Sequence, residues 1–426
     1  MKSQRRAIAG WCLYDWANSP FAAVVLTFIV PAYFAKAVMD DEAAATAAWG
    51  FMSGGAALAL ALLAPVVGAI ADQGRGRKPF LAAATLVMAA ATAAIWWVTP
   101  HDSDAALLLW LVAIATVAFE LGMVFYNALL PGLVPPARLG RVSGLGWGIG
   151  YFGGLAGLVV ILFGFVQAGT PPFGLDRDTA EHVRIAGPIV ALWAVVFALP
   201  LFVWTPEPHG GPGLPAGRAV AAGLATLARD LAALWHDPAR RPMARFLIAR
   251  TLYIDGVNTL FAFGGIYAAT VFAMSVAEVA YFGIALNITA GLGAIAFGWL
   301  DDRLGARATI LAGICGIVAC GIPILVLGDA IWFWIFGAAL GTFFGPVQAA
   351  SRSLMARLAP PGAEGEAFGL FGFSGRALSF VGPWLVGAVT MATASPRWGL
   401  ATVIPFLIVG GLLLLTVREP RRAGQD

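Results

Sequence analysis

The chain has few of the residues on which enzymes and metal centres depend. Only three cysteines and four histidines occur among its 426 residues. Cys12, Cys315 and Cys320 lie inside apolar stretches without the spacing of zinc ligands, so we interpret them as small packing residues. All four histidines fall in predicted loops, and no Walker-type phosphate loop occurs. We therefore expect no cofactor, no metal and no enzymatic activity.

Charged residues are also scarce. Asp, Glu, Lys and Arg make up 12% of the chain and apolar residues 60%, a balance typical of a membrane protein. The net charge of +3 includes no basic patch interleaved with aromatic residues, which argues against a nucleic-acid partner. The lipid bilayer is the expected surrounding.

Long apolar runs predict an all-α membrane protein with twelve transmembrane helices. Each run reaches about 20 residues, the length that crosses the hydrocarbon core as a helix. The runs are 10–38, 47–71, 79–99, 105–131, 142–167, 185–205, 244–273, 277–300, 308–327, 330–355, 367–392 and 398–417. The fifth run contains Gly148-x-Gly150-x-x-Gly153, which matches a dinucleotide-binding pattern, but no strand precedes it and close helix packing is the better interpretation.

Basic residues mark one side of the membrane. With a cytoplasmic N-terminus, the loops on the opposite side hold only Lys36, Arg177, Arg184 and Arg397. Most other Lys and Arg residues fall on the N-terminal side, which predicts that both termini are cytoplasmic. Lys2, Arg5 and Arg6 precede the first run without a signal-peptide cleavage pattern, so we expect this run to stay in the membrane.

Three patterns recur in the same order in the two halves of the chain. Asp15-x-x-Asn18 returns as Asp255-x-x-Asn258, each inside an apolar run. Gly68-x-x-x-Asp72 returns as Gly298-x-x-x-Asp302, and residues 133–157 align without a gap with residues 358–382. The repeats predict six-helix halves at 1–205 and 243–426. Residues 206–242 form the expected connector, whose amphipathic part around 219–235 would lie on the cytoplasmic membrane surface.

Such halves resemble the major facilitator superfamily of secondary transporters. The superfamily has a Gly-x-x-x-Asp-Arg/Lys-x-Gly-Arg/Lys-Arg/Lys signature between its second and third helices, and Gly298 to Arg307 is similar to it. The first-half copy departs from the signature, since Gln73 replaces the first base and Gly74 to Lys78 carries an extra residue. The resemblance implies that these loops latch neighbouring helices. The gating residues it implies are Asp72, Arg75, Arg77, Lys78, Asp302, Arg303 and Arg307. Basic loop residues with a helix-capping aspartate are the simpler alternative.

A narrower resemblance lies in three further segments. Tyr14-Asp-Trp-Ala-Asn-Ser19, Gly345-Pro-Val-Gln-Ala-Ala-Ser-Arg-Ser353 and Glu364-Gly-Glu-Ala-Phe-Gly-Leu-Phe371 resemble signatures of the vacuole-effluxer-like branch. Fungal members of this branch are linked to release of amino acids from the vacuole after autophagy. The short loops and the Ala/Gly-rich composition indicate a bacterial protein, so we expect a multi-pass protein of the bacterial cytoplasmic (inner) membrane.

Charged residues within the apolar runs are the candidates for mechanism, because each costs about 2.5–3.5 kcal/mol at a helix centre. Under the superfamily architecture, helices one, four, seven and ten line a central cavity. The substrate or coupling candidates on these helices are Asp15, Asn18, Glu120, Asn127, Asp255, Asn258, Gln348, Ser351 and Arg352.

Several roles remain open for these charges. An ion pair between Arg352 and Asp15 or Asp255 would serve as a gate, as part of a substrate or proton site, or as static pairing between helices. Arg245 and Arg250 are expected to reach the cytoplasmic interface. Glu120, near the middle of the fourth run, is the leading candidate for a titrating group.

We thus expect a monomeric secondary transporter of a small polar organic solute, with amino acids as the first substrate class and protons as one coupling ion. An exporter or flippase of amphipathic molecules such as lysolipids or drugs is the alternative. A non-transporting membrane sensor is the third possibility. The sequence leaves the solute and the direction of transport open.

Overall fold

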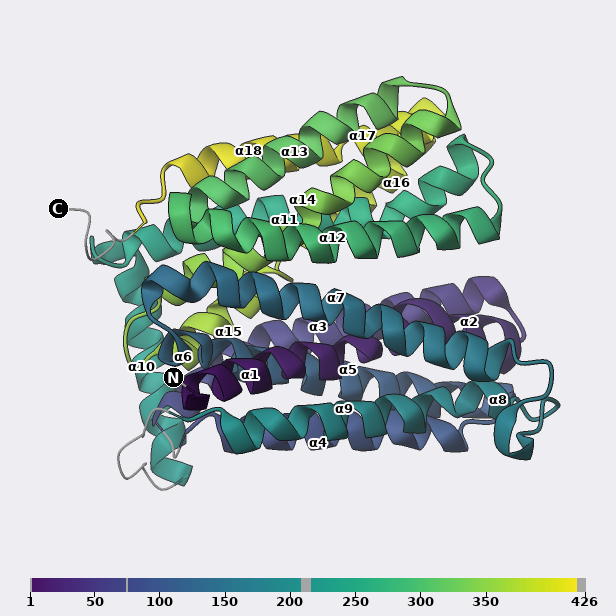
Figure 1. Ribbon diagram of the computed structural model, residues 1–426, viewed down its shortest axis with the longest axis horizontal. Coiled ribbons are helices and arrows are strands. Elements are labelled where there is room, and N and C mark those ends of the chain that lie inside the picture. The colour runs from purple at the N-terminus through teal and green to yellow at the C-terminus, as the bar shows by residue number, and fades with distance from the viewer. Residues whose placement is uncertain (1, 74–75, 208–215, 420–426) are drawn as a thin grey trace. The chain divides into compact units, whose positions relative to one another are not determined.

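The computed structural model describes residues 2–73, 76–207 and 216–419, and in these ranges every regular element is a helix (Figure 1). Contacts between residues group the chain into two compact units. Unit 1 comprises Met1–Leu63, Arg75–Tyr126 and Ile149–Gly211. Unit 2 comprises Ala64–Gly74, Asn127–Gly148 and Pro212–Asp426. Three helices, α3, α5 and α7, therefore contribute residues to both units.

The first part of the chain forms ten helices and several short helical turns. The α-helices are α1 (Lys2–Pro20), α2 (Ile29–Tyr33), α3 (Glu42–Gln73), α4 (Lys78–Ala93), α5 (Ala105–Ala128), α6 (Leu130–Leu133), α7 (Leu139–Ile161), α8 (Glu181–Arg184), α9 (Ala186–Trp204) and α10 (Ala216–His236). The π-helical segments are η1 (Phe21–Phe28), η2 (Phe34–Val38) and η6 (Leu162–Val166). The 3-10 turns are η3 (Ala94–Trp97), η4 (Asp102–Asp104), η5 (Pro136–Arg138) and η7 (Pro172–Gly174).

Unit 1 is held together by close packing of α1 on α9. A Cβ on Gly10 of α1 would lie 2.6 Å from the Pro200 carbonyl oxygen of α9, so the two backbones touch. Trp193 Nε1 donates to the Trp16 carbonyl oxygen at 3.2 Å. Pro20 ends the regular part of α1, and the chain continues as the π-helix η1 because proline supplies no N–H and crowds the preceding turn.

The remaining helices belong to unit 2. They are α11 (Arg241–Val271), α12 (Val276–Leu304), α13 (Ala306–Val326), α14 (Ala330–Leu358), α15 (Glu364–Ser374), α16 (Val381–Thr393), α17 (Pro396–Ala401) and α18 (Val403–Leu415). Helix α14 packs against both α12 and α13. Its contact with α12 needs glycine, because a Cβ on Gly345 would lie 2.1 Å from the Ala290 carbonyl oxygen. Helix α11 packs mainly along α18.

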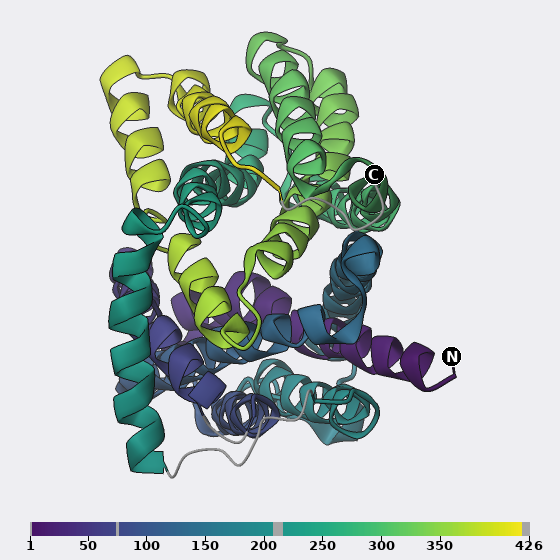
Figure 2. The same ribbon diagram turned by 90° about the vertical axis from the view of Figure 1, so that its left-hand side faces the viewer.

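Eleven helices among the described residues are long and apolar enough to cross a membrane. They account for eleven of the twelve predicted runs. The twelfth run, 367–392, is a helix in two pieces, α15 and α16, separated by turn residues 375–380 (Figure 2). The expectation of one continuous helix there was wrong, although the run itself lies where it was predicted.

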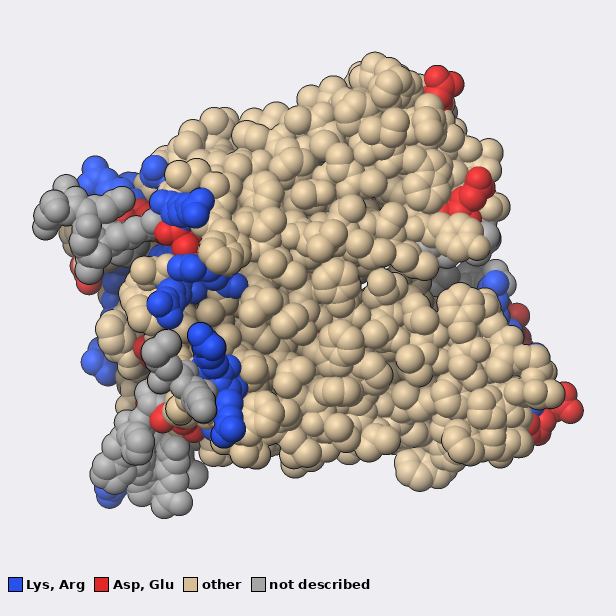
Figure 3. Space-filling view, in the orientation of Figure 1, with Lys and Arg blue, Asp and Glu red and all other residues tan. Residues whose placement is uncertain are grey.

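Exposed charged side chains avoid the helix middles on one face of the molecule (Figure 3). On the face shown in Figure 3, the central stretches of the helices carry no Lys, Arg, Asp or Glu at the surface, and the blue Lys and Arg side chains lie at helix ends. This distribution suits spans whose middles face hydrocarbon.

Two smaller features concern α10 and a glycine pattern. Ala216–His236 form the helix α10, and a Cβ on its Gly223 would lie 2.9 Å from the Ile70 amide nitrogen of α3. The Gly148-x-Gly150-x-x-Gly153 pattern serves helix packing, since a Cβ on Gly153 would lie 2.8 Å from the Trp16 backbone.

Candidate functional site

Asp15 is buried in unit 1 and bound by a tyrosine of α5. Its side chain is 5% exposed, and the Tyr126 hydroxyl donates to Asp15 Oδ2 at 2.8 Å. The Tyr126 ring stacks on Trp11 with a centroid distance of 4.5 Å and on Tyr14 at 4.9 Å. Trp11 Nε1 in turn donates to the Tyr126 carbonyl oxygen at 3.1 Å. This packing fixes the phenol, so the carboxylate meets a positioned donor.

Asn18 faces the same helix as Asp15. Its amide Nδ2 donates to Met123 Sδ at 3.2 Å, one turn of α5 before Tyr126. The predicted common direction of the Asp15 and Asn18 side chains is therefore present in unit 1. Glu120 lies a further turn back on α5 and is half-buried.

Arg352 occupies the most buried charged position in α14. It is 1% exposed, and Nε donates to Ser143 Oγ at 2.9 Å while Nη2 donates to the Ser143 carbonyl oxygen at 2.6 Å. Nη1 donates to Asn127 Oδ1 at 3.4 Å, and the guanidinium lies 5.6 Å from the centre of the Trp147 ring. Unit 2 thus brings together Arg352 and Asn127, as predicted candidates, with Ser143 and Trp147, which sequence reasoning missed.

The neighbours of Arg352 on α14 differ in their surroundings. Ser351 is fully buried, its Oγ lies 2.7 Å from the Tyr253 hydroxyl of α11, and it also donates to the Val347 carbonyl oxygen. Gln348 is half-buried, and its side chain makes no hydrogen bond within the described part of the chain. Tyr253 was not singled out from the sequence, although it lies two residues before the repeated aspartate.

Asp255 is 2% exposed and caps the start of α16. Its Oδ2 accepts a hydrogen bond from the Gly382 amide at 3.0 Å. The two copies of the aspartate motif therefore have different partners, a tyrosine hydroxyl for Asp15 and a backbone amide for Asp255. Asn258 is the second member of the repeated motif. It is half-buried, and its side chain makes no hydrogen bond within the described residues.

Arg250 was expected to reach the cytoplasmic interface, but the structure buries it. It is 7% exposed, and Nη1 donates to the Phe371 carbonyl oxygen at 2.6 Å and to Ser374 Oγ at 2.7 Å. The Phe371 carbonyl oxygen at the end of α15 also accepts from the Gly375 amide and the Ser374 hydroxyl, and the guanidinium lies 3.5 Å from the Phe371 ring centre. Arg245 is exposed at the start of the same helix, as predicted.

The two repeated loop aspartates cap helices that belong to the opposite sequence half. Asp72 at the end of α3 accepts from the Gly365 and Glu366 amides of α15, at 3.0 and 2.9 Å. Asp302 at the end of α12 accepts from the Gly140 and Arg141 amides of α7, at 2.9 and 3.3 Å. In the alignment of residues 133–157 with 358–382, these are equivalent positions. A carboxylate at a helix N-terminus satisfies free amides and complements the helix dipole.

The basic residues of these loops have other contacts. The Arg77 and Lys78 amides donate to Glu207, and Lys78 Nζ donates to the Phe202 and Thr205 carbonyl oxygens at the end of α9. Arg307 Nη1 donates to the Val417 carbonyl oxygen at 2.9 Å. Arg303 is exposed, and Arg75 lies outside the described residues.

Two glutamates at equivalent places were missed by sequence reasoning. Glu207 follows α9 and caps α4, whereas Glu419 follows α18 and accepts from the Ala306 and Arg307 amides of α13, both at 3.2 Å. The glycines facing them, Gly76 and Gly305, have φ of 116° and 102°, a conformation that disfavours any side chain. These two glycines are structural equivalents, so the extra residue of the first loop falls before Gly76. The signal in the sequence was a glutamate shortly after the last helix of each half.

A buried ionic cluster accompanies Asp302. Arg357 Nη1 lies 2.6 Å from Asp301 Oδ1 and 3.0 Å from Glu419 Oε1, and Ser353 Oγ donates to Asp301. The guanidinium is 6% exposed and Asp301 1%. Because Asp301 immediately precedes the signature aspartate, no pattern in the sequence distinguished the roles of the two carboxylates.

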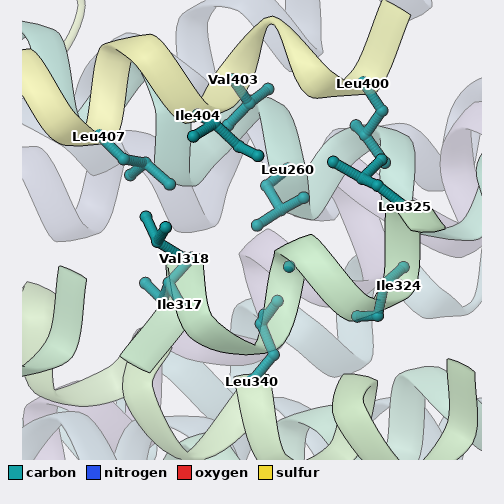
Figure 4. Close-up of a pocket in the computed structure, with 11 residues that line it drawn as sticks. Leu260, Ile317, Val318, Ile324, Leu325, Leu340, Leu400, Val403, Ile404 and Leu407 are labelled. Atoms are coloured by element: carbon teal, nitrogen blue, oxygen red, sulfur yellow. The ribbon is translucent and has the colours of Figure 1, made fainter. Parts of the chain in front are cut away.

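An apolar cavity lies elsewhere in unit 2, between α11, α13, α14 and α18 (Figure 4). It is lined by Leu260, Ile317, Val318, Gly321, Ile324, Leu325, Leu340, Leu400, Val403, Ile404 and Leu407. Aliphatic side chains offer no hydrogen bond to a polar ligand, so this cavity cannot bind a polar solute specifically.

Comparisons with known proteins agree on one family. The family model described as Vacuole effluxer Atg22 like matches residues 40–425. The MFS-type transporter YxiO of Bacillus subtilis (strain 168) is 26% identical over 98% of this chain and 96% of its own length. Autophagy-related protein 22 of Cryptococcus neoformans (strain B-3501A) is 25% identical over 63% of this chain, and the match spans about half, 51%, of the fungal protein.

Solved structures show the fold. The human organic anion transporter MFSD10 (TETRAN) superposes with a TM-score of 0.75 at 16% identity, covering 96% of this chain and 99% of that one. The fucose:proton symporter FucP of E. coli has a TM-score of 0.72 at 15% identity, with 99% of both chains covered. The chain is therefore a multi-pass membrane protein with the twelve-helix fold of major facilitator transporters, and it belongs to the vacuole effluxer Atg22-like family.

Proposed function

We propose that the chain is a secondary active transporter that moves a small polar organic solute by alternating access, with amino acids as the first substrate class. It works as a monomer in a bacterial inner membrane with both termini in the cytoplasm. The Bacillus subtilis relative is named as an MFS-type transporter. The matching family model is described as vacuole effluxer Atg22 like. The twelve-helix fold supplies the two related halves that such a cycle requires.

The buried Arg352 is the observation that carries this proposal. A guanidinium 1% exposed inside a membrane span is costly, and three polar contacts from Ser143 and Asn127 hold it in place. A guanidinium suits a carboxylate because its planar fork donates two parallel hydrogen bonds.

The capping aspartates supply the switching contacts. Asp72 and Asp302 each accept hydrogen bonds from backbone amides of a helix in the other sequence half, and Arg141 also binds Asp302. Such contacts are local and reversible, as a latch that opens once per cycle must be. We assign Asp72 and Asp302 this role, and we assign Arg77, Lys78 and Arg307 to the anchoring of helix ends within their own halves.

Counterflow in proteoliposomes tests the proposal. Purified protein is reconstituted into vesicles loaded with one unlabelled amino acid, and uptake of the same radiolabelled amino acid is followed. We expect accumulation for at least one amino acid and its loss in Arg352→Ala, whereas Arg352→Lys retains a charge without the fork and gives intermediate uptake. Equal counterflow in wild type and Arg352→Ala would contradict the assignment.

A second candidate is export of amphipathic molecules. The aliphatic cavity of Figure 4 is the observation that favours it, because its lining has the chemical character that contacts an acyl chain. Thermal-shift screening against lysolipids and amino acids separates the two functions, since a ligand that binds the folded state raises the midpoint of unfolding. Stabilisation by lysolipids alone would replace the first proposal with the second.

A further inference from the structure

Every described backbone N–H group at the start of α16 already donates a hydrogen bond. The Val381 amide donates to the Leu378 carbonyl oxygen at 2.8 Å, and the Trp384 amide donates to the Phe380 carbonyl oxygen at 3.2 Å. The Gly382 amide donates to Asp255, and Pro383 has no N–H to donate. The start of α16 is therefore not a site for an anion.

Two oxygen atoms beside this turn lack partners. Asp255 Oδ1 and Thr259 Oγ1 are buried and make no hydrogen bond among the described residues, and both residues are 2% exposed. They lie four positions apart on α11 and so share a face. Both face Gly382, because a Cβ there would lie 2.1 Å from Thr259 Oγ1 and 2.9 Å from Asp255 Oδ2.

The orientation of Thr259 is unusual for its helix. A threonine inside a helix commonly donates to the carbonyl oxygen of the preceding turn. Thr251 and Thr270 of α11 do so, each at 2.9 Å, to the carbonyl oxygens of Leu247 and Ile266. The Thr259 hydroxyl makes no such bond and is free to coordinate a ligand at the break.

No basic side chain neutralises Asp255. Among the described residues, no Lys, Arg or His nitrogen lies within ion-pair distance of its carboxylate. Arg250, on the same helix, bonds to Phe371 and Ser374, and Arg352 of α14 bonds to Ser143 and Asn127. The other titratable residues on the turn and on the helices packed against α11 are Arg376 in the turn, Glu364 and Glu366 on α15, Arg357 on α14, Glu278, Tyr281, Asp301, Asp302 and Arg303 on α12, Arg218, Arg229, Asp230 and His236 on α10, and Arg397 on α17.

We propose that Asp255 and Thr259 bind the coupling cation of transport, a proton or Na⁺, at the break between α15 and α16. The unpartnered atoms are a carboxylate oxygen and a hydroxyl, which suit a cation and not an anion. A single carboxylate balances a single positive charge, whereas divalent ions in proteins usually gather several carboxylates. Either cation removes the cost of a lone charge in a membrane span.

The site is placed to link cation binding to helix movement. The charged carboxylate fastens Gly382 of α16 to α11 by a charge-assisted hydrogen bond. Neutralisation of Asp255 weakens that bond, so occupancy of the site changes how firmly α16 is held. This inference rests on the proposed transport function, and it assigns the coupling role to Asp255 in place of Glu120.

Charge-displacement recording on a solid-supported membrane tests the site without any solute. Vesicles containing the purified protein receive either a pH jump without Na⁺ or a Na⁺ jump at constant pH. We expect the wild type to give a transient current in one arm and Asp255→Asn to give none in that arm. A loss in the pH arm identifies the proton, and a loss in the Na⁺ arm identifies Na⁺.

Two further variants keep the test independent of folding. Thr259→Val removes the hydroxyl at constant shape, so the half-maximal cation concentration should rise about tenfold, the effect of losing about 1.4 kcal/mol. Thr259→Ser retains the hydroxyl and should stay close to wild type. Asp329→Asn, at an exposed aspartate before α14, is the matched control for the charge change and should keep the full current.

The outcomes separate this site from the transport proposal. A current that survives in both Asp255→Asn and Thr259→Val, including one that only Glu120→Gln abolishes, overturns the site. Absence of any current in the wild type overturns it as well. A cation-dependent current lost in Asp255→Asn, in a protein that shows no counterflow of any solute, would uphold the site and reject the transport function.

Discussion

Identical residues of the two repeats act differently because their neighbours differ. Asp15 and Asp255 occupy the same position of the repeated motif, yet one accepts from the Tyr126 hydroxyl and the other from the Gly382 amide. An internal repeat specifies that two carboxylates are buried in related helices. It does not specify their partners, which differ between the two copies.

The bond from Tyr126 to Asp15 predicts a measurable loss of stability. Tyr126→Phe keeps the ring stacks on Trp11 and Tyr14 but removes the hydroxyl that donates to Asp15 Oδ2. Hydrogen bonds to charged groups contribute about 1.5–3 kcal/mol, so we expect a destabilisation of that size in denaturant titrations of the detergent-solubilised protein. Tyr281→Phe, at a residue 64% exposed, is the control and should be neutral. Equal stability of both variants would show that the bond contributes nothing.

At the scale of helices, the apolar runs were sufficient to predict the spans but not the break in one of them. Residues 133–157 and 358–382 align without a gap and share glycines, yet the first segment continues into the unbroken α7. The second breaks after Ser374, where Arg250 binds the C-terminal end of α15 and Asp255 binds the start of α16. These stabilising contacts come from α11, which is far away in the sequence, so the glycine pattern alone could not reveal them.

Gly382 offers a direct test of the contact between α11 and α16. A Cβ there would lie 2.1 Å from Thr259 Oγ1, so Gly382→Ala should destabilise the protein by about 1–3 kcal/mol through overpacking and should abolish the cation-dependent current. Gly387→Ala on the same helix meets no atom within 4 Å and should be neutral or slightly stabilising. Both are measured by thermal unfolding in detergent. If the two variants were equally stable, α16 would not be seated on α11 as described.

The crossed caps predict a loss of stability when either aspartate is removed. Asp72→Ala takes a carboxylate away from two backbone amides and should cost at least about 0.5–2 kcal/mol. Asp302→Ala takes a carboxylate away from two backbone amides and from Arg141 Nε, which lies 2.5 Å from it, and should also destabilise the protein by at least this amount. Asp329→Ala, before α14, is the control because that side chain makes no capping bond. Unfolding midpoints of the Asp72 and Asp302 variants equal to that of the control would contradict the assigned contacts.

For the molecule as a whole, the sequence was sufficient to predict the class of protein and the candidate site residues. It was not sufficient to predict which of these residues contact one another. Arg352 and Asn127 meet in unit 2 as two members of one predicted set, whereas Ser143, which makes two of the contacts to Arg352, carries no signal beyond being a small polar residue. Burial of a charge can be predicted from an apolar run. The groups that satisfy the charge depend on tertiary packing and require the structure.

The orientation of the chain in the membrane is the last prediction, and it follows from the placement of basic residues. Lys and Arg cluster at the helix ends that include Arg5 and Arg6, and anionic lipids and the insertion machinery retain such ends in the cytoplasm. Reporter fusions at the C-terminus and at Gly210, which both lie outside the described residues, should therefore report cytoplasm. A fusion at Gly169, in the loop after η6, is the matched control and should report the opposite side. An external signal at the C-terminus or at Gly210 would overturn the topology, and with it the assignment of the Asp72 and Asp302 caps to the cytoplasmic side.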